Sequence, residues 1–312
     1  MSAFMLFAIL IPLLFAFYLR YFDLSWQLEN LAAFLPLFPI YFALLALIFL
    51  LMRRWLVSAG VFIMAMGSLL GLSSSPVVTI GSCSHQRLSV LQYNVYFDNP
   101  SLNSLIAYAK GQQPSLIVLQ EVSPSHGEAL TTLFSLYPYY YGGQSRVGFP
   151  SGQMVLSKTP LYGMRTYRTK AGHAYISLVW QTPFKRDVMV IAAHPPSPRN
   201  EKHWNERNQL LVEIESLALR SPLMFNMVVG DFNLSSSTQR FDRLLTSFHT
   251  APVHSWPVFI KRWQLPSHPV VAIDHLWVRN ENSNQSPICQ RDRVVEITGS
   301  DHAAVLTVLN VE

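Results

Sequence analysis

Three long apolar stretches fill the first 75 residues of the chain. They cover residues 1–19, 31–52 and 55 to about 72. Because a helix crosses a bilayer with ~20 consecutive apolar residues, each stretch predicts a membrane span. No Asp, Glu, Lys, Arg or His lies inside any of them, so nothing indicates a transport pathway. The pattern therefore predicts a membrane anchor of three transmembrane helices over residues 1–75.

Charges beside these stretches predict how the anchor is oriented. The loop between the second and third stretches carries Arg53 and Arg54 and no acid, whereas the first loop carries Arg20 against Asp23 and Glu29. The positive-inside rule therefore puts the Arg pair in the cytoplasm. With three spans, the first loop and everything after the anchor are then extracytoplasmic. The second loop has one Arg more than the first, and the predicted orientation depends on this difference.

After a short linker over residues 76–83, the chain has the pattern of a globular domain over residues 84–312. Short apolar runs predict strands at 88–96, 116–122, 153–157, 176–180, 188–193, 225–229, 272–278 and 303–311. Helices are predicted at 101–113, 127–137, 205–219 and 238–248, and a loop at 139–150. Strands and helices mix without strict β-α-β alternation. This order favours an α+β fold in which helices flank two stacked sheets.

Polar residues suited to metal or phosphate chemistry occur at one predicted strand end after another. They are Asn94, Glu121, His194, Asp231 with Asn233, Asp274, and Asp301 with His302. One such terminus is an ordinary turn, but six of them predict one site assembled at a common edge. In the sequence Gly230-Asp231-Phe232-Asn233, residues two apart on an extended backbone point to the same side. Asp231 and Asn233 are therefore expected to address one point.

The residue types select among kinds of site. Carboxylate and amide oxygens suit a hard cation, Mg²⁺ or Mn²⁺. The sequence has no HExxH or CxxC spacing for zinc, no GxSxG for a serine nucleophile and no GxxxxGK for a nucleotide-driven motor. The residue types therefore favour a site for a hard divalent cation.

The motifs LQYNV, LQEV, GDFN, IDHLWV and GSDH, in this order over residues 88–311, resemble the endonuclease/exonuclease/phosphatase superfamily, the DNase I-like group. The resemblance covers nearly the whole domain and implies a four-layered αββα sandwich. The three apolar helices, Arg207 and the run Ser255-Trp256-Pro257 resemble the bacterial membrane-anchored members of this group. That further resemblance implies a multi-pass protein of a bacterial inner membrane.

The resemblance also implies roles for the strand-end residues. Glu121 is the expected principal metal ligand, with Asn94 beside it and Asp301 completing the shell. Asp231 would orient or deprotonate the attacking water, and Asn233 would hold a phosphate oxygen. The remaining expected roles are the contact of His302 with the scissile phosphate, the fixing of its tautomer by Asp274, and charge stabilisation by His194. Arg207 could contact the substrate, and the alternative is that it is a solvated residue on a helix.

The motifs imply hydrolysis of a phosphate ester but leave its identity open. From residue 84 on, the chain has 20 Lys and Arg against 16 Asp and Glu, out of 23 and 18 in the whole chain. This mildly basic balance is compatible with phosphate-bearing substrates. A nuclease is preferred. The alternatives are a phospholipid or sphingomyelin phosphodiesterase or phosphatase, favoured by the tether, and a catalytically dead binding protein. The expected partners are a phosphate ester and the lipid bilayer, with no obligate protein partner evident.

The chain has two cysteines, Cys83 just before the first predicted strand and Cys289 near the last. An extracytoplasmic domain would lie in an oxidising compartment, where a disulfide persists. A Cys83–Cys289 disulfide is therefore expected, and two unpaired thiols are the alternative.

Overall fold

A computed structural model describes residues 3–22, 25–71, 87–143, 152–260, 265–283 and 285–311. The chain divides into two compact units. The first combines Met1–Val77 with Leu234–Arg243, and the second combines Val78–Asn233 with Leu244–Glu312. The predicted linker at 76–83 lies outside the described residues, as do Asp23 and Cys83.

The first unit is built from apolar helices α1 (Ala3–Tyr21), α2 (Trp26–Ala32), α3 (Phe38–Leu51) and α4 (Trp55–Gly71). Within the described residues, Phe4–Tyr21 is the one helix long and apolar enough to cross a membrane. Helix α2 and the segment Leu35–Leu51 would add a second span if this pair, bent by 43°, is one span. The apolar helix Trp55–Ser68 is shorter. One of the three predicted spans is therefore a helix long and apolar enough to cross a membrane by itself. The other two spans stay predictions.

Two ion pairs tie the short helix α8 (Gln239–Arg243) into this unit. Arg20 pairs with Asp242 at 2.5 Å, and Glu29 pairs with Arg240 at 3.0 Å. The side chains of Arg20 and Glu29 are only 8% and 6% exposed. A buried charge without a partner is costly, and α8 supplies the opposite charges that pair with Arg20 and Glu29.

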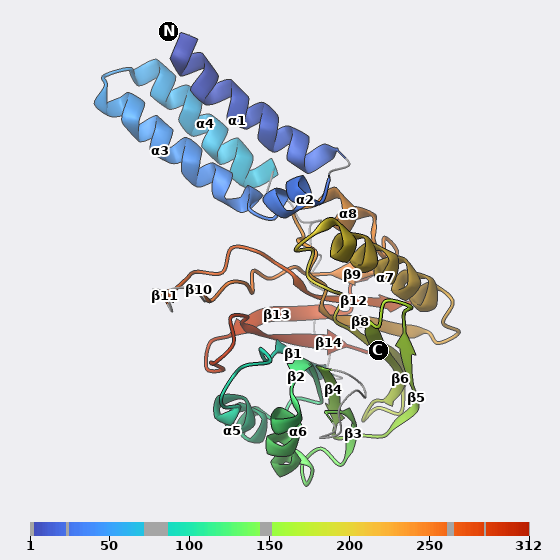
Figure 1. The fold of residues 1–312 in the computed structure, drawn as a ribbon. Helices are drawn as coiled ribbons and strands as arrows, with labels where there is room; N and C mark the ends of the chain where they lie inside the picture. Colours follow the sequence, from blue (N-terminus) through green and yellow to red (C-terminus); the bar gives the residue numbers. More distant parts are fainter. Residues whose placement is uncertain are drawn as a thin grey trace. The chain divides into compact units, whose positions relative to one another are not determined.

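The second unit is a sandwich of two six-stranded sheets (Figure 1). The order in the first sheet is β13-β14-β1-β2-β4-β3 and in the second β5-β6-β7-β8-β12-β9. The first sheet consists of β1 (Arg87–Asn94), β2 (Leu116–Val122), β3 (Tyr139–Gly142), β4 (Gly152–Ser157), β13 (Ile288–Val294) and β14 (Ala304–Asn310). The second consists of β5 (Leu161–Arg168), β6 (Ala174–Gln181), β7 (Asp187–Ala193), β8 (Phe225–Asp231), β9 (His249–Thr250) and β12 (Asp274–Asn280). The small strands β10 (Phe259–Ile260) and β11 (Leu265–Pro266) form a separate pair.

Apolar side chains from both sheets form one core between them, and helices cover the two outer faces. Val90 and Val118 from the first sheet pack in the same buried cluster as Val190 and Val229 from the second. Helices α5 (Asn103–Gln112) and α6 (Pro124–Leu130) lie beside the first sheet, and α7 (Glu201–Leu219) lies beside the second (Figure 1). The expected αββα layering is confirmed.

Strand directions bring the predicted site residues to one edge of the sandwich. Strands β1 and β2 are parallel, as are β7 and β8, so each pair ends on the same side of its sheet. Strand β12 runs antiparallel to β8 with Asp274 opposite Asp231. Strand β14 runs antiparallel to β1, and residue 302 precedes its start by two positions. Strand ends and strand beginnings therefore meet at one edge.

Several local predictions were wrong. The helix predicted over 238–248 is only α8, because Leu245 takes a left-handed backbone with φ 50°. The helix predicted at 127–137 starts earlier, at Pro124, and ends at Leu130 before a 3₁₀ turn. Residues 139–142 of the predicted loop form β3, and residues 144–150 lie outside the described part.

Strands β5 and β13 were missed for a common reason. Each lies at the edge of its sheet, and neither has a continuous apolar run. An edge strand exposes one face and one side to solvent, so it keeps polar and charged side chains that mask the strand pattern. Cys289 lies in β13 and is disulfide-bonded, while its expected partner Cys83 is outside the described residues.

Candidate active site

Asn94 joins two carboxylates that come from different sheets. It is the last residue of β1 and is fully buried. Its Nδ2 donates to Glu121 Oε1 and to Asp231 Oδ2, each at 2.9 Å. Its Oδ1 accepts from the Tyr96 backbone N at 3.0 Å. Asn94 thus lies beside Glu121 as expected, and the amide nitrogen faces the carboxylates.

A β-bulge presents the Glu121 carboxylate to the site. The register of β2 against β4 shifts between Gln120 and Val122, so Glu121 is an extra residue with no cross-strand partner. Its φ is 55°, a left-handed conformation that costs a non-glycine residue of order 1 kcal/mol. The Phe97 backbone N donates to Glu121 Oε2 at 3.1 Å. The local strain is held by the surrounding sheet and sets the direction of this acid.

The GDFN segment depends on a close approach between β7 and β8. A Cβ on Gly230 would lie 1.9 Å from Ala193 O, so a side chain cannot be accommodated there. Strand β8 ends at Asp231, which is 1% exposed, and the Asn233 backbone N donates to Asp231 Oδ1 at 2.9 Å. Asn233 has φ 48° and its Nδ2 donates to Pro195 O at 3.1 Å. The expectation of an extended backbone through Asn233 was therefore wrong, because Asn233 lies in a left-handed turn after the strand ends.

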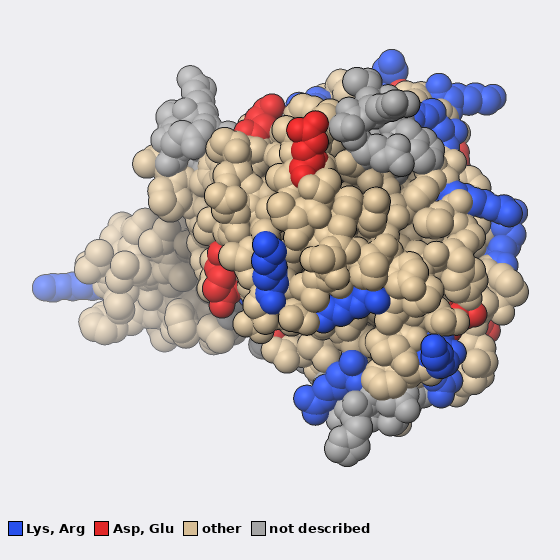
Figure 2. Space-filling model, turned by 90° about the horizontal axis from the view of Figure 1, so that it is seen from below, with Lys and Arg blue, Asp and Glu red and all other residues tan. Residues whose placement is uncertain are grey.

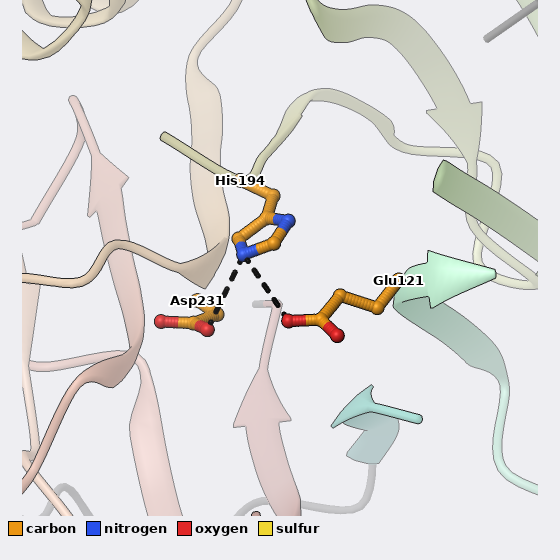
Figure 3. A group of neighbouring side chains, drawn as sticks. All are labelled: Glu121, His194 and Asp231. Atoms are coloured by element: carbon orange, nitrogen blue, oxygen red, sulfur yellow. Dashed lines mark ion pairs between the residues drawn. The ribbon is translucent and has the colours of Figure 1, made fainter. Parts of the chain in front are cut away.

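His194 follows β7 and lies between the carboxylates of Glu121 and Asp231 (Figure 3). Its Nε2 is 3.5 Å from Asp231 Oδ2 and 3.8 Å from Glu121 Oε1. Burial disfavours the charged imidazole, but the Asp231 hydrogen bond and the two negative charges outweigh it. The pKa of His194 is therefore raised above its ordinary value.

His302 and Asp274 form a buried pair next to this group. His302 Nδ1 lies 2.8 Å from Asp274 Oδ2, and Ser255 Oγ donates to the same oxygen at 2.5 Å. His302 Nε2 is 3.7 Å from Asp231 Oδ2. Burial opposes the imidazolium, but the charges of Asp274 and Asp231 raise the pKa of His302 to about 10. At neutral pH His302 is therefore a cation between two acids.

The pKa values of the two acids move in opposite directions. Burial alone would raise the pKa of Asp231, but the His302 charge and the contacts of His194 hold it well below the ordinary value. Burial raises the pKa of Asp274, only partly offset by His302 and Ser255. Two acids in one buried cluster with opposed shifts are typical of catalytic sites.

Asp301 and Arg207 lie at the margin of these groups. Asp301 Oδ2 accepts from Trp256 Nε1 at 3.0 Å. Arg207 is 1% exposed, and its Nη1 donates to Asn233 O at 2.8 Å while its other guanidinium nitrogens contact Asn208 Oδ1. The structure thus places Arg207 behind the GDFN turn. Ser255 was not predicted as a site residue, although its run Ser255-Trp256-Pro257 stood out in the sequence.

Among the residues that the structure describes, two sets of side chains have ligand atoms within 4.8 Å of one another: Glu121 with His194 and Asp231, and Asp231 with Asp274 and His302. In the second set, His302, Asp274 and Ser255 are already hydrogen-bonded to one another. In the first set two carboxylates from opposite sheets converge, and like charges at that separation favour a cation between them. Its oxygen donors fit a divalent hard cation such as Mg²⁺ or Mn²⁺.

Comparison with solved structures shows the same fold. TDP2 from D. rerio complexed with a single strand DNA product has 16% identity and a TM-score of 0.60, over 72% of this chain and 99% of that one. An endonuclease/exonuclease/phosphatase from Beutenbergia cavernae has 16% identity and a TM-score of 0.55, over 72% of each chain. The human Nocturnin catalytic domain with a bound sulfate anion has 14% identity and a TM-score of 0.51, over 73% and 96%.

Sequence comparison identifies the family. No curated protein matches the chain. The model of the Endonuclease/Exonuclease/phosphatase family matches residues 91–302, which is more than half of the chain and includes every site residue described above. Members of this superfamily are metal-dependent phosphoester hydrolases. The chain belongs to the Endonuclease/Exonuclease/phosphatase family.

Proposed function

We propose that this protein is a membrane-anchored, divalent-metal-dependent phosphodiesterase, most simply of the nuclease type. One observation carries the proposal. The metal-compatible group of Glu121, Asp231 and His194 lies directly beside the His302–Asp274 pair, and Asp231 belongs to both. A site for a cation and a buried imidazolium thus share one carboxylate, an arrangement that suits water attack on a phosphate ester.

Each residue has a separate task in this reaction. When bound, Mg²⁺ or Mn²⁺ would neutralise charge that develops on the phosphate, and the carboxylates of Glu121, Asp231 and Asp301 would hold the ion. Asn94 would fix Glu121 and Asp231 through its amide nitrogen. Asp231 orients or deprotonates the attacking water. His302 stabilises the phosphate oxygens as a cation, and Asp274 fixes its orientation through Nδ1.

Three further groups would contact the phosphate or shape its site. His194 adds positive charge to the phosphoryl site. Asn233 is proposed to hold a phosphate oxygen, and Arg207 supports it from behind through the bond to its carbonyl. Burial strengthens the electrostatic part of these contacts.

Membrane attachment is proposed from the first unit. The helix Phe4–Tyr21 is long and apolar enough for a span, and side chains such as Phe4, Leu56 and Ile63 are 70% or more exposed. Exposed apolar side chains at this density fit a lipid environment. We propose that α2 with α3, and α4, complete a three-span anchor in a bacterial inner membrane.

The orientation proposed for the anchor puts the catalytic unit outside the cytoplasm. The ion pairs of Arg20 and Glu29 with α8 support an orientation in which these two residues and α8 lie on the same side of the membrane. With Arg53 and Arg54 at the opposite, cytoplasmic side, this agrees with the positive-inside rule. The disulfide of Cys289 also favours an oxidising compartment.

Figure 2 shows Lys and Arg side chains scattered over one face, several of them side by side along its right-hand edge, with Asp, Glu and uncharged residues between them. Strong backbone binding needs many phosphate contacts from clustered cations. Arg146, Lys261, Arg262 and Trp263 lie outside the described residues. Phospholipid phosphodiester or phosphomonoester hydrolysis is the second candidate, favoured by the membrane anchor.

The test uses the full-length chain purified in detergent, with plasmid DNA, RNA, sphingomyelin, phosphoinositides and a chromogenic phosphodiester as parallel substrates. We expect Mg²⁺-dependent hydrolysis that chelation abolishes and that falls at least about a hundredfold in Asp231→Ala and His302→Ala. The exposed Asp292→Ala is the matched control. Equal turnover in all three variants would reject the site, and cleavage of lipid substrates alone would select the second candidate.

A further inference from the structure

Ser255 and Trp256 are neighbours in the chain, and each hydrogen-bonds a different carboxylate of the site. Ser255 Oγ donates to Asp274 Oδ2, and Trp256 Nε1 donates to Asp301 Oδ2. Asp274 binds the Nδ1 of His302, and Asp301 precedes His302 in the chain. One dipeptide therefore contacts two of the acids next to the same imidazole.

Backbone hydrogen bonds fix this dipeptide on two sides. Ala303 N donates to Ser255 O at 2.8 Å, which ties it to the Asp301-His302 segment. Val271 N donates to Trp256 O at 2.9 Å, and Ser255 N donates to Val271 O at 3.0 Å, shortly before β12 begins. Because its backbone is held by both segments, the dipeptide can transmit a defined position to each carboxylate.

The Ser255 hydroxyl determines which oxygen of Asp274 faces His302. Both donors use Oδ2, whereas Oδ1 is buried without a hydrogen-bond partner among the described residues. If the Ser255 hydroxyl were removed, the bond from His302 would be left to hold the rotation of this carboxylate. Ser255 itself is fully buried, so water does not replace it freely.

Trp256 acts on the other carboxylate by the same means. Its indole N–H is a donor only, and its bond to Oδ2 fixes one oxygen of the Asp301 carboxylate. A partner that orients a metal ligand from behind typically changes metal affinity by about 10- to 100-fold when it is lost.

We propose that Ser255 and Trp256 are positioning residues with separate targets. Ser255 orients Asp274 and, through it, the imidazole of His302. Trp256 orients the Asp301 carboxylate toward the cation. The Trp256 part rests on the proposed function, since it takes Asp301 as part of the metal site. The two residues should consequently affect different parameters: Ser255 the turnover number, Trp256 the affinity for metal.

The test compares Ser255→Ala and Trp256→Phe with Trp180→Phe in the full-length protein. The control removes an indole hydrogen bond of similar length, 2.9 Å to Thr159 Oγ1, at the opposite end of β6 from the site. Mn²⁺ binding is measured from the free-ion EPR signal, without substrate. Turnover of a chromogenic phosphodiester is measured at saturating Mn²⁺.

We expect Trp256→Phe to raise the Mn²⁺ dissociation constant about tenfold or more and to leave turnover at saturating metal within about threefold. Ser255→Ala should lower turnover about tenfold and leave the Mn²⁺ dissociation constant within about twofold. Equal Mn²⁺ affinity in Trp256→Phe and Trp180→Phe would overturn the Trp256 role. A shift in the same parameter by both variants would overturn their separation.

The outcome also separates this inference from the proposed function. A wild-type protein that binds Mn²⁺ but cleaves no substrate refutes the proposed function alone, and the EPR comparison still decides the role of Trp256. A wild-type protein that binds no Mn²⁺ overturns both.

Discussion

Replacing Asp274 by Asn removes one charge from the centre of the site and keeps the size of the side chain. The amide oxygen introduced by Asp274→Asn could still accept from His302 Nδ1 and from Ser255, so the change isolates the carboxylate charge. We expect His302 to lose much of its preference for the imidazolium. The protein should become less stable near neutral pH, and turnover should fall.

The pKa of His302 sets the size of the effect. A rise from 6.5 to about 10 corresponds to about 5 kcal/mol of stabilisation of the folded state, at about 1.4 kcal/mol per pH unit. Asp274 and Asp231 share this effect, and the buried Asp274 carboxylate itself carries a desolvation cost. The expected loss is therefore about 2 kcal/mol, or about 4–8 °C in Tm for a domain of this size.

The pH dependence of the difference gives the sharper test. A raised His pKa stabilises the fold fully below pH 6.5, and that contribution disappears as the pH rises through about 10. The Tm of Asp274→Asn should therefore lie furthest below that of wild type at pH 6, and the gap should close toward pH 10. Thermal unfolding in detergent measures it, with the exposed Asp292→Asn as control. A gap that is constant from pH 6 to pH 10 would refute the assignment of a charged His302–Asp274 pair.

Three other outcomes are expected. Gly230→Ala should destabilise the fold by about 3 kcal/mol or more, because its Cβ would meet Ala193 O, whereas Gly111→Ala in an open helical position should not; similar melting curves would contradict this. Arg207→Met should lower both turnover and stability, the latter by about 1–3 kcal/mol, since it removes the buried guanidinium that binds the half-buried Asn233 carbonyl; the exposed Lys110→Met should change neither. A periplasmic reporter such as alkaline phosphatase fused after residue 80 should be active, and activity of a cytoplasmic reporter there would reverse the proposed orientation.

The sequence predicted the sandwich well because most of its strands are buried on both faces. Runs such as 116–122 and 225–229 are mostly apolar, so both were recognised as strands. The same strands pair in parallel with β1 and β7, which brings polar residues at their ends together. That is why Glu121, His194 and Asp231 could be grouped without any structure.

The sequence patterns did not predict features that depend on local backbone conformation. The bulge at Glu121 and the left-handed turn at Asn233 arise where neighbouring segments impose a conformation that neither residue prefers. The charge of Arg207 suggested a solvated helix position, yet it is buried against the GDFN turn. Only tertiary packing distinguishes these cases from ordinary surface positions.

The two sheets differ in how the chain builds them. The second sheet uses one continuous stretch, from β5 to β12, whereas the first combines β1–β4 with β13 and β14 from the far side of that stretch. Asn94 and Asp231, hydrogen-bonded across the sandwich, are 137 residues apart in sequence. Contacts this distant close late in folding and slow it. Recovery of activity after refolding would thus report completion of the entire sandwich, and no fragment holding a single sheet could carry the site.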